Sequence, residues 1–337
     1  MVMATLKDIS KETGISITQV SRALGGFDDV NAETRRRVEE AAAKLGYRAN
    51  LMARGLKTGQ SGNVAMVVPR QLDASAREVL FEVVWGISAE FSRRGKRLIL
   101  HVTAYANDIS VYDQLYRSGG VDGFVVIGPT VNDPRIVQLA DRGIPFVVHG
   151  RDPSCAHDFV DLDNAALIGS MVSAARKLGH ADIAFLNGPA DLPFAQARAR
   201  GFDQAVKGAG DCRILNAPMT FEAGHDLTIS LLTGKNPPSA IIAGNLMMAA
   251  GVYAAVKEAG LQVPRDLSVL AHDDGLEHYD PDAFDPPIGG TRSELGAAWS
   301  ALASSFDRRI THPDIEAQVT ELEFEFRQGA SIQPPRE

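Results

Sequence analysis

The first fifty residues carry short apolar clusters at helical spacing, separated by glycines. The pattern predicts three short helices, bounded by Thr5 and Gly14, by Ser16 and Gly25, and by Asn31 and Gly46. Ser16 and Gln19 form an S-x-x-Q capping box, which is typical of a helix start. Val20 and Leu24 stand four residues apart, so we expect both to face inward against the first helix.

The first two predicted helices are joined by the three-residue turn Gly14-Ile15-Ser16 and form a helix-turn-helix. The outward face of the second helix presents Ile17, Thr18, Ser21 and Arg22. Arg22 suits guanine O6 and N7, Thr18 suits several base edges, and Ile17 suits a thymine methyl group. Ser21 suits a phosphate. This face is predicted to read DNA; a plain three-helix bundle with an exposed Ile and Arg is the alternative.

Charge is divided unevenly along the chain. The net charge is −8, yet residues 1–60 hold ten Lys and Arg against seven Asp and Glu, so the remainder carries −11. A basic module beside an acidic bulk suits docking on phosphates.

From Gly62 onward, short apolar strands alternate with helical stretches. Strands are predicted at 64–68, 97–100, 123–127, 145–148, 183–186, 240–243 and 267–270. Helices are predicted around 79–94, 164–178, 194–208 and 246–259. Such alternation indicates parallel sheets in two halves, with a ligand crevice at the carboxyl ends of the strands. An enzyme of the doubly wound class has the same pattern.

Several classes of protein are excluded by what the chain lacks. No apolar run approaches a membrane span, and the N-terminus is no signal peptide. Cys155 and Cys212 make neither a disulfide framework nor a metal site, which suits a reducing cytoplasm. There is no phosphate-binding loop or catalytic triad motif, so no enzyme activity, cofactor or metal is expected.

The runs TLKDISKETGISITQVSRALGG and VNAETRRRVEEAAAKLGYRANLMARGL resemble the headpiece of the lactose-repressor (LacI/GalR) family. The resemblance implies that Ile17, Thr18 and Arg22 are the principal base readers. It also implies a hinge helix near residues 50–58 that forms on operator DNA and wedges Leu56 into the minor groove. The predicted DNA-binding residues are Thr5, Ile17, Thr18, Ser21, Arg22, Asn50, Arg54 and Leu56.

Later runs, among them RGIPFVVHGR, GPADLPFAQARARGF and SAIIAGNLMMAAGVYAAVKEAGLQVPRDLSVLAHDD, resemble the sensing domain of the same family. The resemblance implies a type I periplasmic-binding-protein-like fold of two α/β subdomains around a cleft. The predicted effector-binding residues are Arg70, Gln71, His149, Arg198, Asn245 and Asp273. Capping of the next helix is an alternative role for Asn245, and an ion pair at the edge of the cleft is the alternative for Arg198 and Asp273. For Trp85, a core position is favoured over a stacking platform on the cleft wall. Leu246, His272 and Gly289-Gly290 depart from the family pattern.

The resemblance implies a headpiece at 1–48, a hinge at 49–60 and a sensing domain at 61–337. One subdomain is expected at about 61–160 and 291–320, the other at about 161–290 and 321–330. The C-terminal RQGASIQPPRE has no heptad, so a homodimer is expected. The predicted function is a cytoplasmic, nucleoid-associated repressor that binds near-palindromic operator DNA and a sugar-like effector. A small-molecule binding protein without regulatory DNA binding is the alternative.

Overall fold

The computed structural model describes residues 4–25, 29–47, 59–71, 74–105, 108–208, 210–276 and 278–336, without the side chains of 74–78. The chain divides into two units, Met1–Ser61 and Gly62–Glu337. The predicted hinge residues Asn50, Arg54 and Leu56 lie outside the described residues.

The first unit is a bundle of three helices, α1 (Leu6–Thr13), α2 (Ile17–Leu24) and α3 (Ala32–Lys44). All three predicted helices are therefore confirmed. Their small core consists of Ile9, Val20, Ala23, Val38, Ala41 and Ala42. Leu24, which was predicted to face inward, is only half-buried, because Ala23 takes the inward position beside Val20.

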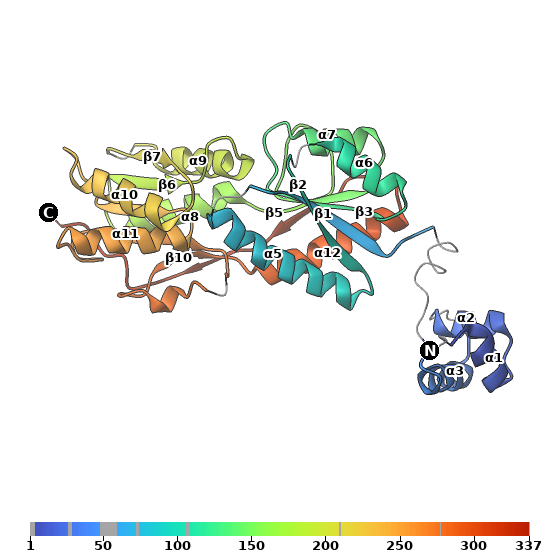
Figure 1. Ribbon diagram of the computed structural model, residues 1–337. Coiled ribbons are helices and arrows are strands. Elements are labelled where there is room, and N and C mark those ends of the chain that lie inside the picture. The colour runs from blue at the N-terminus through green and yellow to red at the C-terminus, as the bar shows by residue number, and fades with distance from the viewer. Residues whose placement is uncertain are drawn as a thin grey trace. The chain divides into compact units, whose positions relative to one another are not determined.

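The second unit contains two six-stranded sheets, which Figure 1 shows as two α/β lobes. The first sheet has the order β11-β5-β4-β3-β1-β2, and every pairing in it is parallel. Its strands are β1 (Asn63–Pro69), β2 (Arg97–Thr103), β3 (Gly123–Ile127), β4 (Phe146–His149), β5 (Phe159–Leu162) and β11 (Val319–Leu322). The helices of this lobe are α5 (Ala74–Arg93), α6 (Ile109–Arg117), α7 (Pro134–Asp141) and α12 (Leu295–Thr311).

The second sheet has the order β12-β10-β9-β8-β6-β7, with only β12 antiparallel to its neighbour. Its strands are β6 (Ile183–Asn187), β7 (Arg213–Asn216), β8 (Ala240–Ala243), β9 (Ser268–Asp273), β10 (Gly289–Arg292) and β12 (Glu325–Arg327). The helices are α8 (Asn164–Lys177), α9 (Pro193–Ala205), α10 (Phe221–Leu232) and α11 (Leu246–Glu258), followed by a short 3-10 turn, η1 (Pro281–Ala283).

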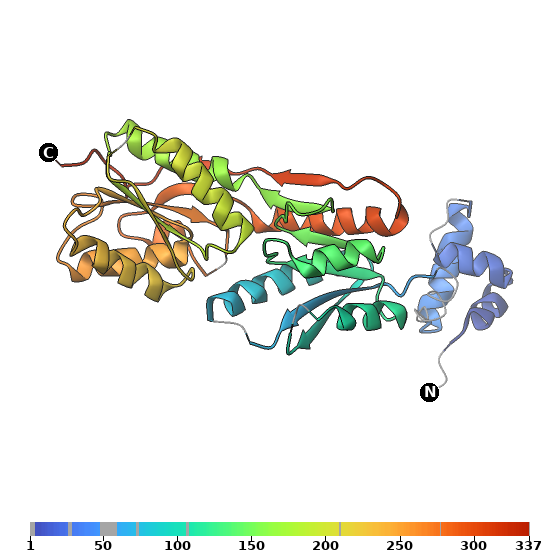
Figure 2. The same cartoon turned by 90° about the horizontal axis from the view of Figure 1, so that it is seen from above.

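The chain passes between the lobes three times, after β5, after β10 and after β11; these passages are visible from above in Figure 2. Each sheet has an apolar core on both faces, and the two cores of the first lobe lie against α5 and α12 and against α6 and α7. The seven predicted strands are confirmed, and β5, β7, β10, β11 and β12 are additional. The additional strands are short and carry polar residues, so their hydrophobic pattern is weak.

Close backbone packing explains one departure from the family pattern. Gly290 has φ +150°, and a Cβ there would lie 1.8 Å from the carbonyl oxygen of Ala271 on the neighbouring strand. Glycine is therefore required at this position, and its hydrogen side chain offers nothing to a ligand.

Candidate nucleic-acid interface and ligand site

The helix-turn-helix is fixed at the start of α2 by Ser16. Its Oγ accepts a hydrogen bond from the backbone N–H of Gln19 at 3.2 Å. The reciprocal bond from the Gln19 side chain is not found in the described part of the headpiece, so the predicted capping box is one-sided. The cap still satisfies one of the N–H groups that a helix start leaves without an intrahelical partner.

The outward face of α2 presents the predicted base readers. Ile17 is 42% exposed and Thr18 is also exposed, whereas Ser21 and Arg22 are half-buried. An exposed Ile at a helix start suits contact with an apolar partner such as a thymine methyl group.

Thr5 has a structural role in addition to its predicted contact with DNA. Its backbone N–H and its hydroxyl both donate to the Asp8 carboxylate, at 2.8 and 2.7 Å. These bonds lower the pKa of Asp8 and keep a negative charge in the first turn of α1, where the helix dipole favours it.

Arg22 makes a two-point contact with Asp29, which lies between α2 and α3. Its Nη2 lies 2.6 Å from Asp29 Oδ2, and its Nε donates to Asp29 Oδ1 at 3.2 Å. Elsewhere in the headpiece, basic side chains tie α3 to α1. Arg37 donates to the carbonyl of Thr13 at 2.9 Å, and Lys44 lies 2.6 Å from Glu12.

Arg198 of α9 is buried near the carboxyl ends of the second sheet. Its Nε donates to Asn164 Oδ1 and its Nη1 donates to the carbonyl of Gly244, both at 2.8 Å, while its guanidinium lies over the ring of Phe194. Burial lowers the pKa of Arg198, and the charges of Asp274 and Asp161 act in the opposite direction.

Asn245 caps α11, as the alternative interpretation predicted. Its Oδ1 accepts from the backbone N–H of Met248 at 2.9 Å, and its Nδ2 donates to the carbonyl of Met219. Asn245 also lines a small hollow together with Leu246, Met247, Asp273, Asp274, Leu276 and Tyr279. Asn245 therefore combines a capping role with a position at the edge of this hollow.

Asp273 and Asp274 at the end of β9 are held differently. Asp273 accepts from the backbone N–H of Gly275 at 2.8 Å and lies 3.6 Å from Arg292, while burial raises its pKa. Asp274 Oδ1 lies 3.0 Å from Nε2 of His272, a ring buried beneath the site. The Nδ1 of His272 lies 3.0 Å from Thr291 Oγ1. The polar ring that replaces the family's aromatic residue is thus hydrogen-bonded on both nitrogens.

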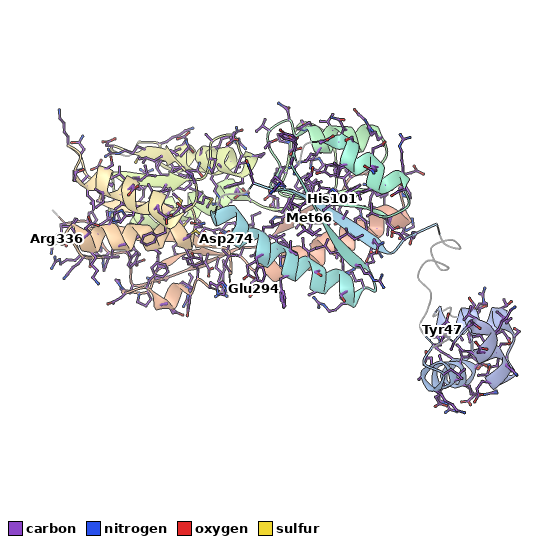
Figure 3. The ribbon with its side chains drawn as sticks, in the orientation of Figure 1. Tyr47, Met66, His101, Asp274, Glu294 and Arg336 are labelled. Carbon is purple, nitrogen blue, oxygen red and sulfur yellow. The ribbon has the colours of Figure 1, made fainter. Side chains whose placement is uncertain are left out.

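His149 ends β4 in the other lobe, and its ring lies 5.3 Å from that of Trp299. Burial lowers the pKa of His149 to about 4, although the charge of Asp274 opposes this shift. Burial acts to raise the pKa of Asp274, but His272, Arg198 and His149 outweigh it, so that the pKa lies below its ordinary value. Figure 3 places Asp274 where the lobes adjoin.

We call His149, Asp161, Arg198, His272 and Asp274 the interlobe cluster. Its members come from both sheets and from α9, and each lies within electrostatic reach of another member. Asp161, on β5, has a pKa raised by burial and opposed by its bond with Leu162 N–H and by Arg151. The sequence interpretation did not assign Asp161, Asn164, His272 or Asp274 to the site. Only His272, which departs from the family pattern, and Asp274, which directly follows the predicted Asp273, had a signal in the sequence.

The structure does not bring every predicted residue to this cluster. Arg70 and Gln71 are exposed after β1, and in the described chain neither side chain forms a hydrogen bond or an ion pair with a cluster member. Arg151 pairs with Asp161 at 3.2 Å and with Glu321 at 3.3 Å. The core position favoured for Trp85 is wrong: its side chain is 70% exposed and stacks on Phe81, because the inward face of α5 is taken by Val83 and Ile87.

No described helix is long and apolar enough to cross a membrane. No group of three or more His, Cys, Asp or Glu side chains is arranged to hold a metal ion among the described residues.

Two family models match the chain. Residues 5–50 match the model for bacterial regulatory proteins of the lacI family, and residues 172–332 match a periplasmic binding protein-like domain. The chain is 36% identical over 307 residues to the HTH-type transcriptional regulator AglR of Rhizobium meliloti (strain 1021), covering 88% of this chain and 85% of that protein.

Solved structures of similar fold include the lac repressor dimer bound to operator and the anti-inducer ONPF. That structure has a TM-score of 0.78 at 20% identity, covering 98% of this chain and 100% of that one. A complex of the transcriptional regulator CelR with cellobiose has a TM-score of 0.70 at 22% identity, covering 97% and 99%.

Proposed function

Because the chain belongs to the lacI family of bacterial regulatory proteins, we propose that it is a homodimeric repressor of carbohydrate-utilisation genes released by a neutral sugar. Its relatives are helix-turn-helix regulators of transcription, not enzymes. Because operator DNA is its proposed target, we propose that the protein acts in the cytoplasm, at the nucleoid.

The DNA-binding part of this proposal rests on the outward face of α2. Exposed Ile17 and Thr18 stand beside Arg22 on a helix whose inward face is anchored by Val20 and Ala23. A recognition helix of this kind enters the major groove, and a two-fold dimer presents two such helices to a near-palindromic site. Asn50, Arg54 and Leu56 remain the proposed hinge contacts.

The effector-binding part of this proposal rests on the balance of charge in the interlobe cluster. Arg198 faces Asp161 and Asp274, so donors and acceptors lie together without a large excess of either sign. A sugar offers hydroxyl groups that both donate and accept, and it brings no charge that would upset this balance. The solved regulator of similar fold holds the neutral disaccharide cellobiose. Asp273 and Asp274 are the proposed acceptors for sugar hydroxyls, Arg198 is the proposed donor, and the Asn245 amide is proposed as a further contact.

Coupling between effector binding and operator binding requires that the effector bind the DNA-released state more tightly than the DNA-bound state. Because His149 comes from one lobe and Asp274 from the other, a ligand that contacts both biases their separation. We propose that the change in lobe separation alters the hinge of each protomer and, through the hinge, the DNA affinity of the headpieces.

Dimerisation is supported by an exposed apolar face on the first lobe. Phe81 and Trp85 stand one turn apart on α5, and the edge strand β2 next to this helix exposes Leu100 and Val102. An apolar patch of this kind marks an interaction surface.

The observation that carries the proposal is the joining of a helix-turn-helix to a partly buried cluster drawn from two lobes. Its test is a thermal-shift screen of the full chain against neutral sugars, sugar phosphates and purine nucleosides, followed by fluorescence anisotropy on an operator selected from random duplexes. A neutral sugar is expected to raise the melting temperature in proportion to ln(1 + [L]/Kd) and to weaken operator binding. Stabilisation by sugar phosphates alone would contradict the neutral-ligand assignment, and selection of no duplex would contradict DNA binding.

A further inference from the structure

A carboxylate stands beside the base-reading arginine of the headpiece. Asp29 lies seven residues after Arg22, outside both flanking helices, and contacts the guanidinium through Nε and Nη2. The side chains of Arg22 and Asp29 are 39% and 58% exposed, so this pair is part of the surface and not of the core.

The negative charge of Asp29 is unfavourable for DNA binding at this position unless its contact with Arg22 compensates for it. A negative charge repels a phosphate-rich partner, and it also lies close to the last turn of α2, where the helix dipole favours cations. The hydrogen bond from Arg22 lowers the pKa of Asp29, so that the carboxylate stays ionised. A side chain with these costs needs a compensating role at a DNA-binding surface.

The geometry of the contact supplies such a role. A guanidinium has a side edge formed by Nε and one Nη, and an end edge formed by the two Nη atoms. Asp29 engages the side edge of Arg22. An end-on bidentate contact with guanine O6 and N7 uses the end edge, so the two contacts are compatible. Asp29 also fixes the plane in which the end edge lies.

Arg36 provides a contrast on the same unit. It is held by Glu33 and Glu40 of its own helix, three and four residues away, as on any solvated helix face. Asp29 comes instead from the loop after α2, where no helical spacing enforces its contact with Arg22.

We propose that Asp29 is a positioning residue, which orients Arg22 for a guanine and thereby sets the specificity of the headpiece at that base pair. The proposal rests on the proposed DNA-binding function. It assigns Asp29 no contact with DNA of its own.

The test compares the full-length protein with Asp29→Asn on a duplex selected by the wild type from a random pool, and on variants of that duplex substituted one base pair at a time. Glu39→Gln, on the exposed face of α3, is the matched control, because it also removes one negative charge from the headpiece. Both variants are expected to bind nonspecific DNA more tightly. Only Asp29→Asn is expected to lose preference at one base pair per half-site, by about twofold to tenfold, the range that ordering one long side chain at an interface spans.

Arg22→Ala identifies the base pair concerned, and adding Asp29→Asn to it is expected to change the preference there no further. Asp29→Glu, which keeps the charge, is expected to recover part of the preference. Unchanged preference in Asp29→Asn would overturn the proposal and leave an ordinary surface ion pair. Tighter specific binding with full preference would also overturn it, since Asp29 would then compete with guanine. If the wild type selects no sequence, the proposed function itself fails, and this result is distinct from the other two.

Discussion

The headpiece and the interlobe cluster use charged side chains in opposite ways. In the headpiece, Asp29 is exposed, Arg22 is half-buried at the surface, and the two lie close together in sequence. In the interlobe cluster, Arg198 and His272 are buried and are held by groups up to 46 residues away. An exposed pair is screened by solvent and contributes little to stability, whereas a buried charge that loses its partner destabilises the whole domain. Substitutions in the two regions should therefore have different effects. Those in the headpiece should alter DNA recognition, whereas those in the interlobe cluster should alter both the response to effector and the stability of the domain.

The largest effect is expected from Arg198→Leu. It leaves Asn164 Oδ1 and the Gly244 carbonyl without their donor and removes the cation that faces Asp274. We expect the free energy of unfolding of the sensing domain to fall by about 3 kcal/mol and the response to effector to be lost. Urea unfolding and operator release, measured on the same preparation, check both parts.

Arg200→Leu is the matched control, because Arg200 is exposed on the same helix. It is expected to change neither property. If Arg198→Leu left the domain as stable as the control, the contrast between a buried cluster and an exposed headpiece pair would be lost.

A pH effect is expected next from His149. Its native pKa of about 4 lies below the ordinary value of 6.5 because the ring is buried. Between these pH values the unfolded state binds a proton that the native state does not, so stability falls as pH falls through this window. From pH 7 to pH 5 this group should account for about 2 kcal/mol.

Burial also lowers the pKa values of His157 and His180, so the wild type is expected to lose stability from several groups at once. The difference between the wild type and His149→Phe isolates one of them. Urea unfolding at pH 7 and pH 5 is expected to show a smaller loss in His149→Phe, and His278→Phe, an exposed site, serves as control. Equal losses in all three proteins would place His149 in contact with water.

His272→Phe is expected to have a smaller effect. The change restores an aromatic ring, but it removes the donor to Asp274 and leaves Thr291 without its bond to the ring. We expect a loss of about 1–2 kcal/mol in stability, and weaker effector binding because Asp274 is no longer oriented. Thr291→Val removes the second bond alone, so it should reduce stability and spare effector affinity. Equal effector affinity in both variants would contradict an orienting role for His272.

The same contrast explains what could be predicted from the sequence. Helix starts and glycine stops lie within a few residues of one another, so Ser16, Gly14 and Asn31 sufficed to locate the headpiece helices. Apolar runs likewise located the buried strands such as β3 and β8. β5 and β11 carry Asp161 and Glu321 within short strands, and only their pairing in the sheet makes them strands.

The interlobe cluster could be predicted only in part. Of its members, His149 and Arg198 were predicted through the family resemblance. The partners that hold Arg198 are Asn164 and the Gly244 carbonyl, which no local pattern connects to it. The roles of Asp273 and Asp274 differ because adjacent residues on a strand end point in different directions. Burial of His272 and exposure of Trp85 also depend on tertiary packing, which the hydrophobic pattern of one segment does not determine.

The smallest effect is expected from the helix cap of the headpiece. It tests whether an interaction between residues close in sequence affects the headpiece alone. Ser16→Ala removes the acceptor for the Gln19 N–H and should lower headpiece stability by about 1 kcal/mol, and DNA affinity with it, while the sensing domain melts unchanged. Gln19→Ala is the control, because the cap uses the backbone of Gln19 and not its side chain, so a change of no more than a few tenths of 1 kcal/mol is expected. Calorimetry that resolves the two units decides between these outcomes. A shift of the sensing-domain transition in Ser16→Ala would show that the two units are energetically coupled, and the separation between local and buried sites would then not hold.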